Sequence, residues 1–289
     1  MAINRVRKAI FPVAGYGTRF LPATKAQPKE MLTLVDKPVV QYLVEEAVEA
    51  GIETIIFVIN SNKHIIGDHF SRNLELEKML RAKKKKALLE SIRHIHKEAE
   101  FIFVHQDEPL GSGDAVMRGR GLVGDEPFAL FYADDVMDSP KGKPAIGQLI
   151  ETFERYHESV MGLIDIPRSQ SRFYGMISGK KIGDRTYQIH GVVEKPDPKD
   201  TPSTLASVGR FIITPDIFQY IPKLKKKNGE IYFADALDAV AKQGKLYGYE
   251  MDAVWHDCGN KLGFFKATVE FGMKHREIGD EARAFLKRI

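Results

Sequence analysis

Residues 11–32 have the sequence FPVAGYGTRFLPATKAQPKEML, and this stretch decides how the fold begins. An apolar run ends here in two glycines, and three cations follow at Arg19, Lys25 and Lys29. Glycine lets main-chain N–H groups approach an anion closely, and cations beside it add charge. The stretch is typical of a strand that opens into a phosphate-binding turn. A turn that serves only tight packing, with solvated lysines, explains the composition about equally well.

Two better-known glycine motifs do not fit this turn. GYGTRF (15–20) begins like a dinucleotide fingerprint, but Phe20 stands where that motif has its third glycine. The second expected strand ends in Asn60, where a ribose-binding acid is typical. The chain contains no GxxxxGK[ST], which excludes a P-loop NTPase.

The composition is that of a globular chain that can bury a large core. It has 289 residues, of which 43% are hydrophobic and 28% charged, and a formal net charge of +4. That charge is far below the density of a dedicated nucleic-acid-binding protein, so we expect no nucleic-acid partner. The basic runs 83–86 and 225–227 lack interleaved aromatic residues and are typical of solvated surfaces.

Cysteine usage and the N-terminus indicate the compartment. The single cysteine, Cys258, excludes an internal disulfide and a multi-cysteine zinc site. The start, MAINRVRKAIFPVAG, lacks the apolar core and the cleavage site of a secretory signal. No apolar stretch approaches the ~20 residues of a membrane span. We therefore expect a cytoplasmic protein without membrane contact.

Apolar runs alternate with segments of helical period, which predicts an α/β fold with a mostly parallel sheet flanked by helices. After about residue 140 the strands have fewer long helices between them, which favours a mixed sheet there. The expected strands are 8–13, 53–59, 101–105, 127–133, 159–166, 173–177, 187–194, 206–213 and 246–251. The expected helices are 36–51, 74–95, 215–221, 232–242 and 260–275.

Eight segments together resemble one family. The run GYGTRFLPATKAQPKEMLTLVDKP (15–38) resembles the N-terminal signature of sugar-1-phosphate nucleotidyltransferases, and its PATKAxPKEML is similar to their bacterial UTP–glucose-1-phosphate uridylyltransferase branch. The other seven segments are HQDEPLGSGDAV (105–116), DEPFALFYADDV (125–136), FYGMI (173–177), VVEKP (192–196), VGRFIITPDIF (208–218), GEIYFADAL (229–237) and HDCGNKLG (256–263). The matches span nearly the whole chain in order.

The resemblance implies a reaction, in which UTP and glucose 1-phosphate give UDP-glucose and pyrophosphate with the help of Mg²⁺. It implies a Rossmann-like nucleotidyltransferase core and a homodimer or homotetramer. We expect a single domain, 1–289, with a nucleotide-binding part at about 1–140, a sugar-phosphate-binding part at about 141–260 and a C-terminal helix at about 260–289. Two alternatives remain. One is the same chemistry with another nucleoside triphosphate, such as dTTP, or another hexose 1-phosphate, and the other is a non-catalytic homologue that binds nucleotide sugars.

An Asp-Asp pair is the expected metal site. Asp134 and Asp135 follow an apolar strand, at the edge where open α/β sheets place their sites. Adjacent carboxylates repel each other without a cation, so the pair indicates Mg²⁺, although a turn or helix cap uses the same residues. The resemblance implies that Asp134 is the catalytic metal ligand and that Asp257 completes the metal site. It implies that Asp135 orients the sugar or a loop of the site.

Three cations are the other expected catalytic residues. In-line attack on a phosphorus needs positioning and charge neutralisation more than a protein nucleophile. The resemblance implies that Arg19 and Lys29 hold the β- and γ-phosphates and that Lys195 binds the sugar phosphate. Lys25 is more typical of a solvated lysine.

The sugar and the base have their own expected residues. The resemblance implies that Glu194 accepts hydrogen bonds from sugar hydroxyls, and that Gly175 and Gly209 let the backbone pass close to the hexose. Gln106 carries a donor and an acceptor, which match the edge of a uracil ring. The remaining expected nucleotide-binding residues are Ala14, Gly15, Gly17, Thr18, Glu30 and Gly111.

One segment departs from the uridylyltransferase pattern. The pattern is close to EPLGLGHAV, whereas this chain has EPLGSGDAV, so Ser112 and Asp114 replace an apolar residue and a histidine. A carboxylate near a triphosphate is unfavourable unless it points away or joins the metal shell.

Overall fold

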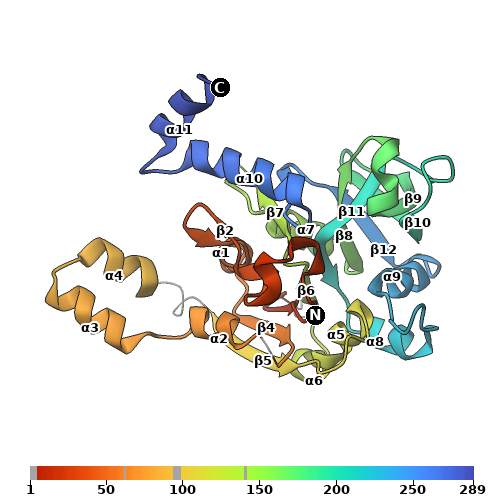
Figure 1. Ribbon diagram of the computed structural model, residues 1–289. Coiled ribbons are helices and arrows are strands. Elements are labelled where there is room, and N and C mark those ends of the chain that lie inside the picture. Colours follow the sequence, from red (N-terminus) through yellow and green to blue (C-terminus); the bar gives the residue numbers. More distant parts are fainter. Residues whose placement is uncertain (1–4, 62, 94–98, 140–141) are drawn as a thin grey trace.

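A mixed sheet of nine strands organises the chain (Figure 1). The structure is a computed structural model that describes residues 5–61, 63–93, 99–139 and 142–289. The strands in these ranges are β1 (Lys8–Pro12), β2 (Thr33–Leu34), β3 (Lys37–Pro38), β4 (Thr54–Ile59), β5 (Glu100–His105), β6 (Phe128–Phe131), β7 (Asp135–Asp138), β8 (Ser159–Asp165), β9 (Gly175–Lys181), β10 (Thr186–Glu194), β11 (Leu205–Ile213), β12 (Leu246–Glu250) and β13 (Val254–Asp257). All nine predicted strands are confirmed, and they are the nine strands of this sheet, although β9 starts and ends later than predicted.

The order of the sheet is β5-β4-β1-β6-β11-β8-β12-β10-β9. Among the described strands of this sheet, parallel pairing is confined to β5–β4–β1–β6 and to the β12–β8 pair. β11 runs antiparallel to β6, β8 and β9, and β10 runs antiparallel to β12 and β9. The α/β class and the mixed sheet are confirmed. The prediction of a mostly parallel sheet holds only for the N-terminal half, because antiparallel neighbours such as β9 and β10 need only a short turn between them.

Helices cover both faces of the sheet (Figure 1). The helices in the described ranges are α1 (Val39–Glu49), α2 (His64–Phe70), α3 (Leu74–Ala82), α4 (Lys86–Arg93), α5 (Ser112–Arg118), α6 (Arg120–Val123), α7 (Ala145–Tyr156), α8 (Ile217–Tyr220), α9 (Phe233–Ala241), α10 (Lys261–Lys274) and α11 (Gly279–Leu286). Side chains alternate across a strand, so neighbours in β1 and β6 belong to opposite cores. Phe11 stacks on Phe131 beneath α1 and α7, whereas Ile10 and Phe128 pack with α5 and α9.

Two predicted helices are each divided in two. The prediction 74–95 becomes α3 and α4, and Lys84 between them has a φ of 54°. Four consecutive lysines disfavour a continuous helix because like charges crowd one another. Residues 94 and 95 lie outside the described residues. The predicted C-terminal helix is α10 followed by α11, with His275 in an extended conformation at the break.

The buried residue Arg210 joins the sheet to two helices. Its guanidinium has no exposed surface and donates to both carboxylate oxygens of Glu46, at 2.7 to 3.1 Å. Glu46 lies on α1 and also accepts from the backbone N–H of Ile146 at the start of α7, at 3.0 Å. The ring of Phe131 lies 4.6 Å from the guanidinium carbon of Arg210. This network fixes β11 directly beside the site described below.

Replacement of Arg210 by Met should lower the free energy of unfolding by about 3 kcal/mol or more, because the carboxylate of Glu46 then stays buried without its cation. Urea unfolding measures the change. The control is Arg185→Met, which removes a half-exposed pair with Asp252 at 3.8 Å and should cost less than about 1 kcal/mol. Equal losses in the two variants would contradict a stabilising role for the buried network.

Candidate active site

A two-stranded ribbon brings three aspartates together. β7 pairs antiparallel with β13, so that Asp257 lies directly opposite Asp135. The backbone N–H of Cys258 donates to the carbonyl of Asp134 at 2.8 Å and extends the pairing by one residue. β7 follows β6 after a short turn, which places all three carboxylates just beyond the carboxyl end of a central strand. This is the edge at which α/β sheets form their ligand sites.

Gly259 lies between the carboxylates of Asp134 and Asp257. A Cβ atom at this position would stand 2.6 Å from Asp134 Oδ2 and 3.0 Å from Asp257 Oδ1. The two oxygens are therefore no further apart than the sum of these distances, and only glycine leaves the space between them open. Mg²⁺ is commonly held by one or two carboxylates together with substrate phosphates, so this pair fits such an ion. Within the described residues, no group of three His, Cys, Asp or Glu side chains is placed to hold a metal.

Lys29 is paired with Asp134. Its Nζ lies 2.6 Å from Asp134 Oδ2. Burial lowers the pKa of Lys29, but the charges of Asp134 and Glu30 outweigh this effect and the pKa stands above its ordinary value. Burial likewise raises the pKa of Asp134, but the charge and hydrogen bond of Lys29 bring it below its ordinary value. Both groups are therefore charged at neutral pH.

Asp135 is held on both of its oxygens. Trp255 Nε1 donates to Oδ1 at 2.6 Å, and the backbone N–H of Gly209 donates to Oδ2 at 3.0 Å. Burial, together with the charges of Asp134 and Asp257, raises the pKa of Asp135 to about 7. The carboxylate of Asp135 therefore joins Trp255 on β13 to the backbone of Gly209 on β11.

Asp257 has a different set of partners. Tyr174 Oη and Asn260 Nδ2 each donate to its Oδ2 at 2.8 Å, and the backbone N–H of Gly259 donates to its Oδ1 at 2.9 Å. Burial and the hydrogen bond to Asp257 raise the pKa of Tyr174, so the phenol stays a donor. These donors fix the direction of the carboxylate relative to Asp134.

A cleft of about 1150 Å³ is lined by half of the predicted site residues. The predicted residues that line it are Arg19, Asp134, Asp135, Gly175, Glu194, Lys195, Gly209 and Asp257. The predicted residues that do not line it are Ala14, Gly15, Gly17, Thr18, Lys29, Glu30, Gln106 and Gly111. Lys29 reaches the cleft through Asp134, and Ser112 lines it immediately after Gly111.

Glu194 and Lys195 form one wall of the cleft at the end of β10. Lys195 Nζ lies 3.2 Å from Glu194 Oε1, and about half of the lysine side chain is exposed. Gly175 on β9 pairs with Glu194 in the ladder. The backbone of Lys195 has a φ of 50°, a left-handed conformation that is uncommon for a residue with a side chain. Such conformations concentrate at functional sites, where the surrounding structure holds them.

The glycine turn after β1 is open to solvent on one side. Gly15 and Thr18 are exposed, and Gly17 has a left-handed φ of 66°. Asn60 Nδ2 donates to the carbonyl of Ala14 at 2.7 Å, so the end of β4 steadies the turn. Arg19 donates to the carbonyl of Gly259 at 3.3 Å, which joins the turn to the aspartate site.

Ser112 and Asp114, the two departures from the family pattern, both have partners. Ser112 Oγ accepts from the backbone N–H of Phe233 at 3.0 Å and satisfies a donor at the start of α9. Asp114 Oδ2 accepts from Gln106 Nε2 at 2.8 Å and from Arg118 Nε at 3.2 Å. The carboxylate of Asp114 therefore faces Gln106 and Arg118, and Arg118 offsets its charge.

Glu30 has a partner that the sequence did not predict. Its carboxylate is 1% exposed and accepts from Lys63 Nζ at 2.8 Å. Burial lowers the pKa of Lys63 even though Glu30 raises it. The structure therefore gives the side chain of Glu30 a buried ion pair with Lys63, and its expected role at the nucleotide stays a prediction.

The side chains that position the site and were not predicted include Lys63, Tyr174, Trp255 and Asn260. Tyr174 lies inside the quoted segment FYGMI, and Trp255 directly precedes HDCGNKLG. An aromatic residue in an apolar segment is most simply explained as core. Only the pairing of β7 with β13 shows that Trp255 donates a hydrogen bond to Asp135.

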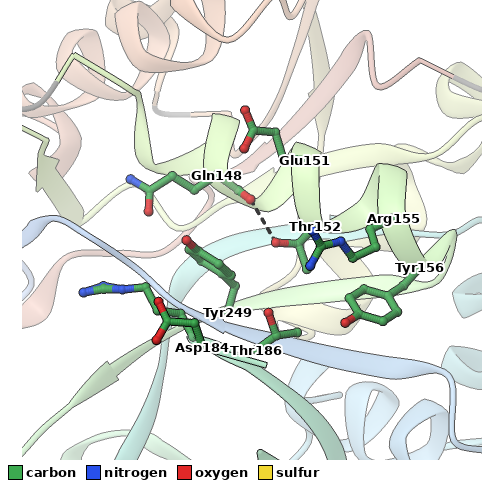
Figure 2. Close-up of a pocket in the computed structure, with 9 residues that line it drawn as sticks. Gln148, Glu151, Thr152, Arg155, Tyr156, Asp184, Thr186 and Tyr249 are labelled. Atoms are coloured by element: carbon green, nitrogen blue, oxygen red, sulfur yellow. Dashed lines mark hydrogen bonds between the residues drawn. The ribbon is translucent and has the colours of Figure 1, made fainter. Parts of the chain in front are cut away.

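A second, smaller cavity of about 240 Å³ lies between α7 and the strands β10 and β12 (Figure 2). It is lined by Gln148, Glu151, Thr152, Arg155, Tyr156, Asp184, Arg185, Thr186 and Tyr249. Thr152 Oγ1 donates to the backbone carbonyl of Gln148 at 3.0 Å. None of these residues lines the large cleft.

Comparisons with known proteins agree with this geometry. A family profile described as Nucleotidyl transferase matches residues 8–272. UTP–glucose-1-phosphate uridylyltransferase 2 of Staphylococcus saprophyticus is 42% identical over 288 residues, which is 99% of each chain. The UTP-bound UGPase from Acinetobacter baumannii has a TM-score of 0.92 at 35% identity and covers 98% of this chain and 99% of that chain. A UDP-glucose pyrophosphorylase complexed with UDP-glucose has a TM-score of 0.85 at 38% identity. The match covers 93% of this chain and 100% of that chain.

Proposed function

The chain belongs to the nucleotidyl transferase family, and from this premise we propose that it is an enzyme that transfers a uridylyl group from UTP to glucose 1-phosphate, giving UDP-glucose and pyrophosphate. One observation carries the proposal. Asp134 and Asp257 line the same cleft as Glu194 and Lys195, and Lys29 reaches this cleft through its contact with Asp134. Carboxylates for a metal and separate cations for two phosphates are the groups that this reaction needs.

The reaction joins two phosphates and uses no protein nucleophile. A phosphate oxygen of glucose 1-phosphate forms a bond to the α-phosphorus of UTP, and the bond from that phosphorus to the bridging α–β oxygen breaks. The electron pair of the broken bond leaves with pyrophosphate. Both reactants are anionic, so the site has to hold them close together and neutralise their charge.

Arg19 and Lys29 would bind the departing pyrophosphate. Lys29 Nζ lies 2.6 Å from Asp134 Oδ2, and Arg19 is exposed and lines the cleft. With a metal held by Asp134, the ammonium of Lys29 would be available to a phosphate oxygen. A guanidinium matches two phosphate oxygens at once, which suits Arg19 to the same task.

Asp134 and Asp257 would hold Mg²⁺, because their facing oxygens leave a space that Gly259 keeps open. The ion would supply charge neutralisation for the reacting phosphates. Asp135 keeps the turn after β6 in place through Trp255 and Gly209.

In the same cleft, Lys195 would hold the phosphate of glucose 1-phosphate, and Glu194 would accept hydrogen bonds from hydroxyls of the hexose. Gly175 and Gly209 also line the cleft, which supports a close approach of the backbone to the sugar. The triphosphate would lie at the turn of Ala14, Gly15, Gly17 and Thr18, with the base near Gln106 and Gly111. We propose this division of labour, with the nucleotide held mainly before about residue 140 and the sugar phosphate after it.

A matrix of substrates tests the proposed function. Pyrophosphate release is measured with UTP, dTTP, CTP, ATP and GTP against several hexose 1-phosphates, with and without Mg²⁺. The proposal expects the highest kcat/KM for UTP with glucose 1-phosphate and turnover only with the metal. Activity with dTTP alone would replace the substrate assignment. Binding of UDP-glucose without turnover of any pair would favour the non-catalytic homologue.

The assembly and the compartment stay predictions. Light scattering, which gives the mass of the particle in solution, tests the expected homodimer or homotetramer. No helix in the described ranges combines the length and the apolar character needed to cross a membrane. Cys258 is a buried free thiol, in agreement with the expectation of a reducing cytoplasm.

A further inference from the structure

We infer that Asp114 is a positioning residue, which turns the amide of Gln106 so that its carbonyl oxygen accepts the N3–H of a uracil or thymine base and rejects cytosine. The inference rests on the proposed function in one respect, namely that a pyrimidine nucleotide binds at this loop. Gln106 follows β5, and Asp114 lies on the first turn of α5.

Two neighbours fix the orientation of the Gln106 amide. Its Nε2 lies 2.8 Å from Asp114 Oδ2 and 3.2 Å from the carbonyl oxygen of Gly111. A carboxylate and a backbone carbonyl only accept hydrogen bonds, so the group that faces them must be the amide nitrogen. The opposite orientation would place Gln106 Oε1 against two further oxygens. The carbonyl of Gln106 therefore points away from Asp114.

The two acceptors are themselves held in place. Gly111 has a φ of 94°, and a Cβ atom there would stand 2.5 Å from the carbonyl oxygen of Ile231. The backbone N–H of Ile231 donates to Leu110, and that of Gly113 donates to Ile231, each at 2.8 Å. Arg118 lies one helical turn after Asp114 and contacts its carboxylate at 3.2 Å. The loop therefore presents a rigid pair of acceptors to Gln106.

The carbonyl oxygen of Gln106 is left for a ligand. Within the residues that the structure describes, no hydrogen bond ends on Gln106 Oε1, and this oxygen is not among the enclosed polar atoms without a partner. Although the residue is 4% exposed as a whole, this atom is thus not sealed in the core. Ser112, two residues before Asp114 in the same segment, lines the large cleft.

A fixed acceptor distinguishes the pyrimidines. Uracil and thymine carry a donor at N3, whereas N3 of cytosine is an acceptor and would meet the oxygen of Gln106 lone pair to lone pair. A glutamine that could rotate would present its NH₂ to cytosine instead and lose this discrimination. Asp114 prevents the rotation because its carboxylate has no proton to offer. A binding site rejects a substrate when binding would leave one of the buried polar groups of the site without a hydrogen-bond partner.

The test compares Asp114→Ala with Asp114→Asn and with Asp107→Ala. Asp107→Ala removes the same charge from an exposed position in the same loop. Dissociation constants for UTP and CTP with Mg²⁺ come from calorimetry, and kcat/KM for both nucleotides comes from pyrophosphate release. Asp114→Ala should reduce the preference for UTP over CTP about 10-fold, the loss of one charge-assisted hydrogen bond. Asp114→Asn should retain the preference, because its amide can present an oxygen to Gln106.

The outcomes are separable. Equal weakening of UTP and CTP in Asp114→Ala, or the same loss of preference in Asp107→Ala, would overturn the inference and leave the proposed function standing. A wild-type chain that prefers UTP in binding but transfers nothing would remove the proposed function, while the binding ratios of the variants still decide the role of Asp114. Absence of pyrimidine nucleotide binding would overturn both.

Discussion

Asp134→Asn lowers kcat by about 10³-fold in our expectation, while the protein stays folded. The substitution removes one of the two facing carboxylates and the charge partner of Lys29, yet it preserves the size of the side chain. Turnover is measured by pyrophosphate release at saturating UTP and glucose 1-phosphate, and folding by circular dichroism and urea unfolding.

The matched control is Asp138→Asn on the same strand, β7. Asp138 pairs with Lys274 at the surface, so its variant should keep kcat within about 2-fold. A metal titration sharpens the result, because Asp134→Asn should also need more Mg²⁺ for half-maximal activity. Unchanged turnover in Asp134→Asn would remove the metal assignment, and an equal loss in both variants would point to a structural role of β7.

Lys195→Met should lower kcat/KM for glucose 1-phosphate by about 10²-fold to 10³-fold, while the dissociation constant for UTP changes by less than about 3-fold. The side chain supplies the one cation that we assign to the sugar phosphate, and methionine preserves its unbranched length. Lysine and methionine both carry a Cβ atom, so the energetic cost of the left-handed φ of 50° at position 195 is the same in the wild type and the variant. Initial rates over a range of glucose 1-phosphate concentrations and calorimetry with UTP separate the two effects.

Lys199→Met is the control for Lys195→Met. Lys199 is exposed a few residues further along the same loop, so its loss changes the net charge equally. It should leave kcat/KM for glucose 1-phosphate within about 2-fold, because an exposed charge in water interacts weakly with a distant one. A loss of UTP affinity in Lys195→Met as large as the loss for glucose 1-phosphate would move Lys195 to the nucleotide side.

Much of the N-terminal half follows from the local sequence. The buried runs of β1 and β4 and the amphipathic period of α1 each occur within a short window, so their type can be predicted without any partner. The carboxylate pair after an apolar strand indicated a metal site, and the resemblance to the family singled out Asp134 within it. The order and direction of the C-terminal strands depend on pairings between distant segments, so only the mixed character of that part of the sheet was predicted, and it is confirmed.

The parts of the site that escaped prediction depend on contacts between distant residues. Trp255 reaches Asp135 across 120 residues of sequence, and Lys63 reaches Glu30 across 33. The hydrophobic periodicity of a sequence cannot predict such a contact, because the register between β7 and β13 depends on the whole fold. The pairing of Gln106 with Asp114 spans only eight residues, yet it depends on a loop that Ile231 holds from elsewhere in the chain.

A crystal structure of the chain with Mg²⁺, glucose 1-phosphate and a UTP analogue that cannot be cleaved at the α–β bridge tests the central claim most directly. We predict a metal ion between Asp134 and Asp257 that contacts the α-phosphate, the terminal phosphates on Arg19 and Lys29, and the sugar phosphate on Lys195. A nucleotide bound away from these aspartates, for example in the small cavity beside α7, would contradict the account.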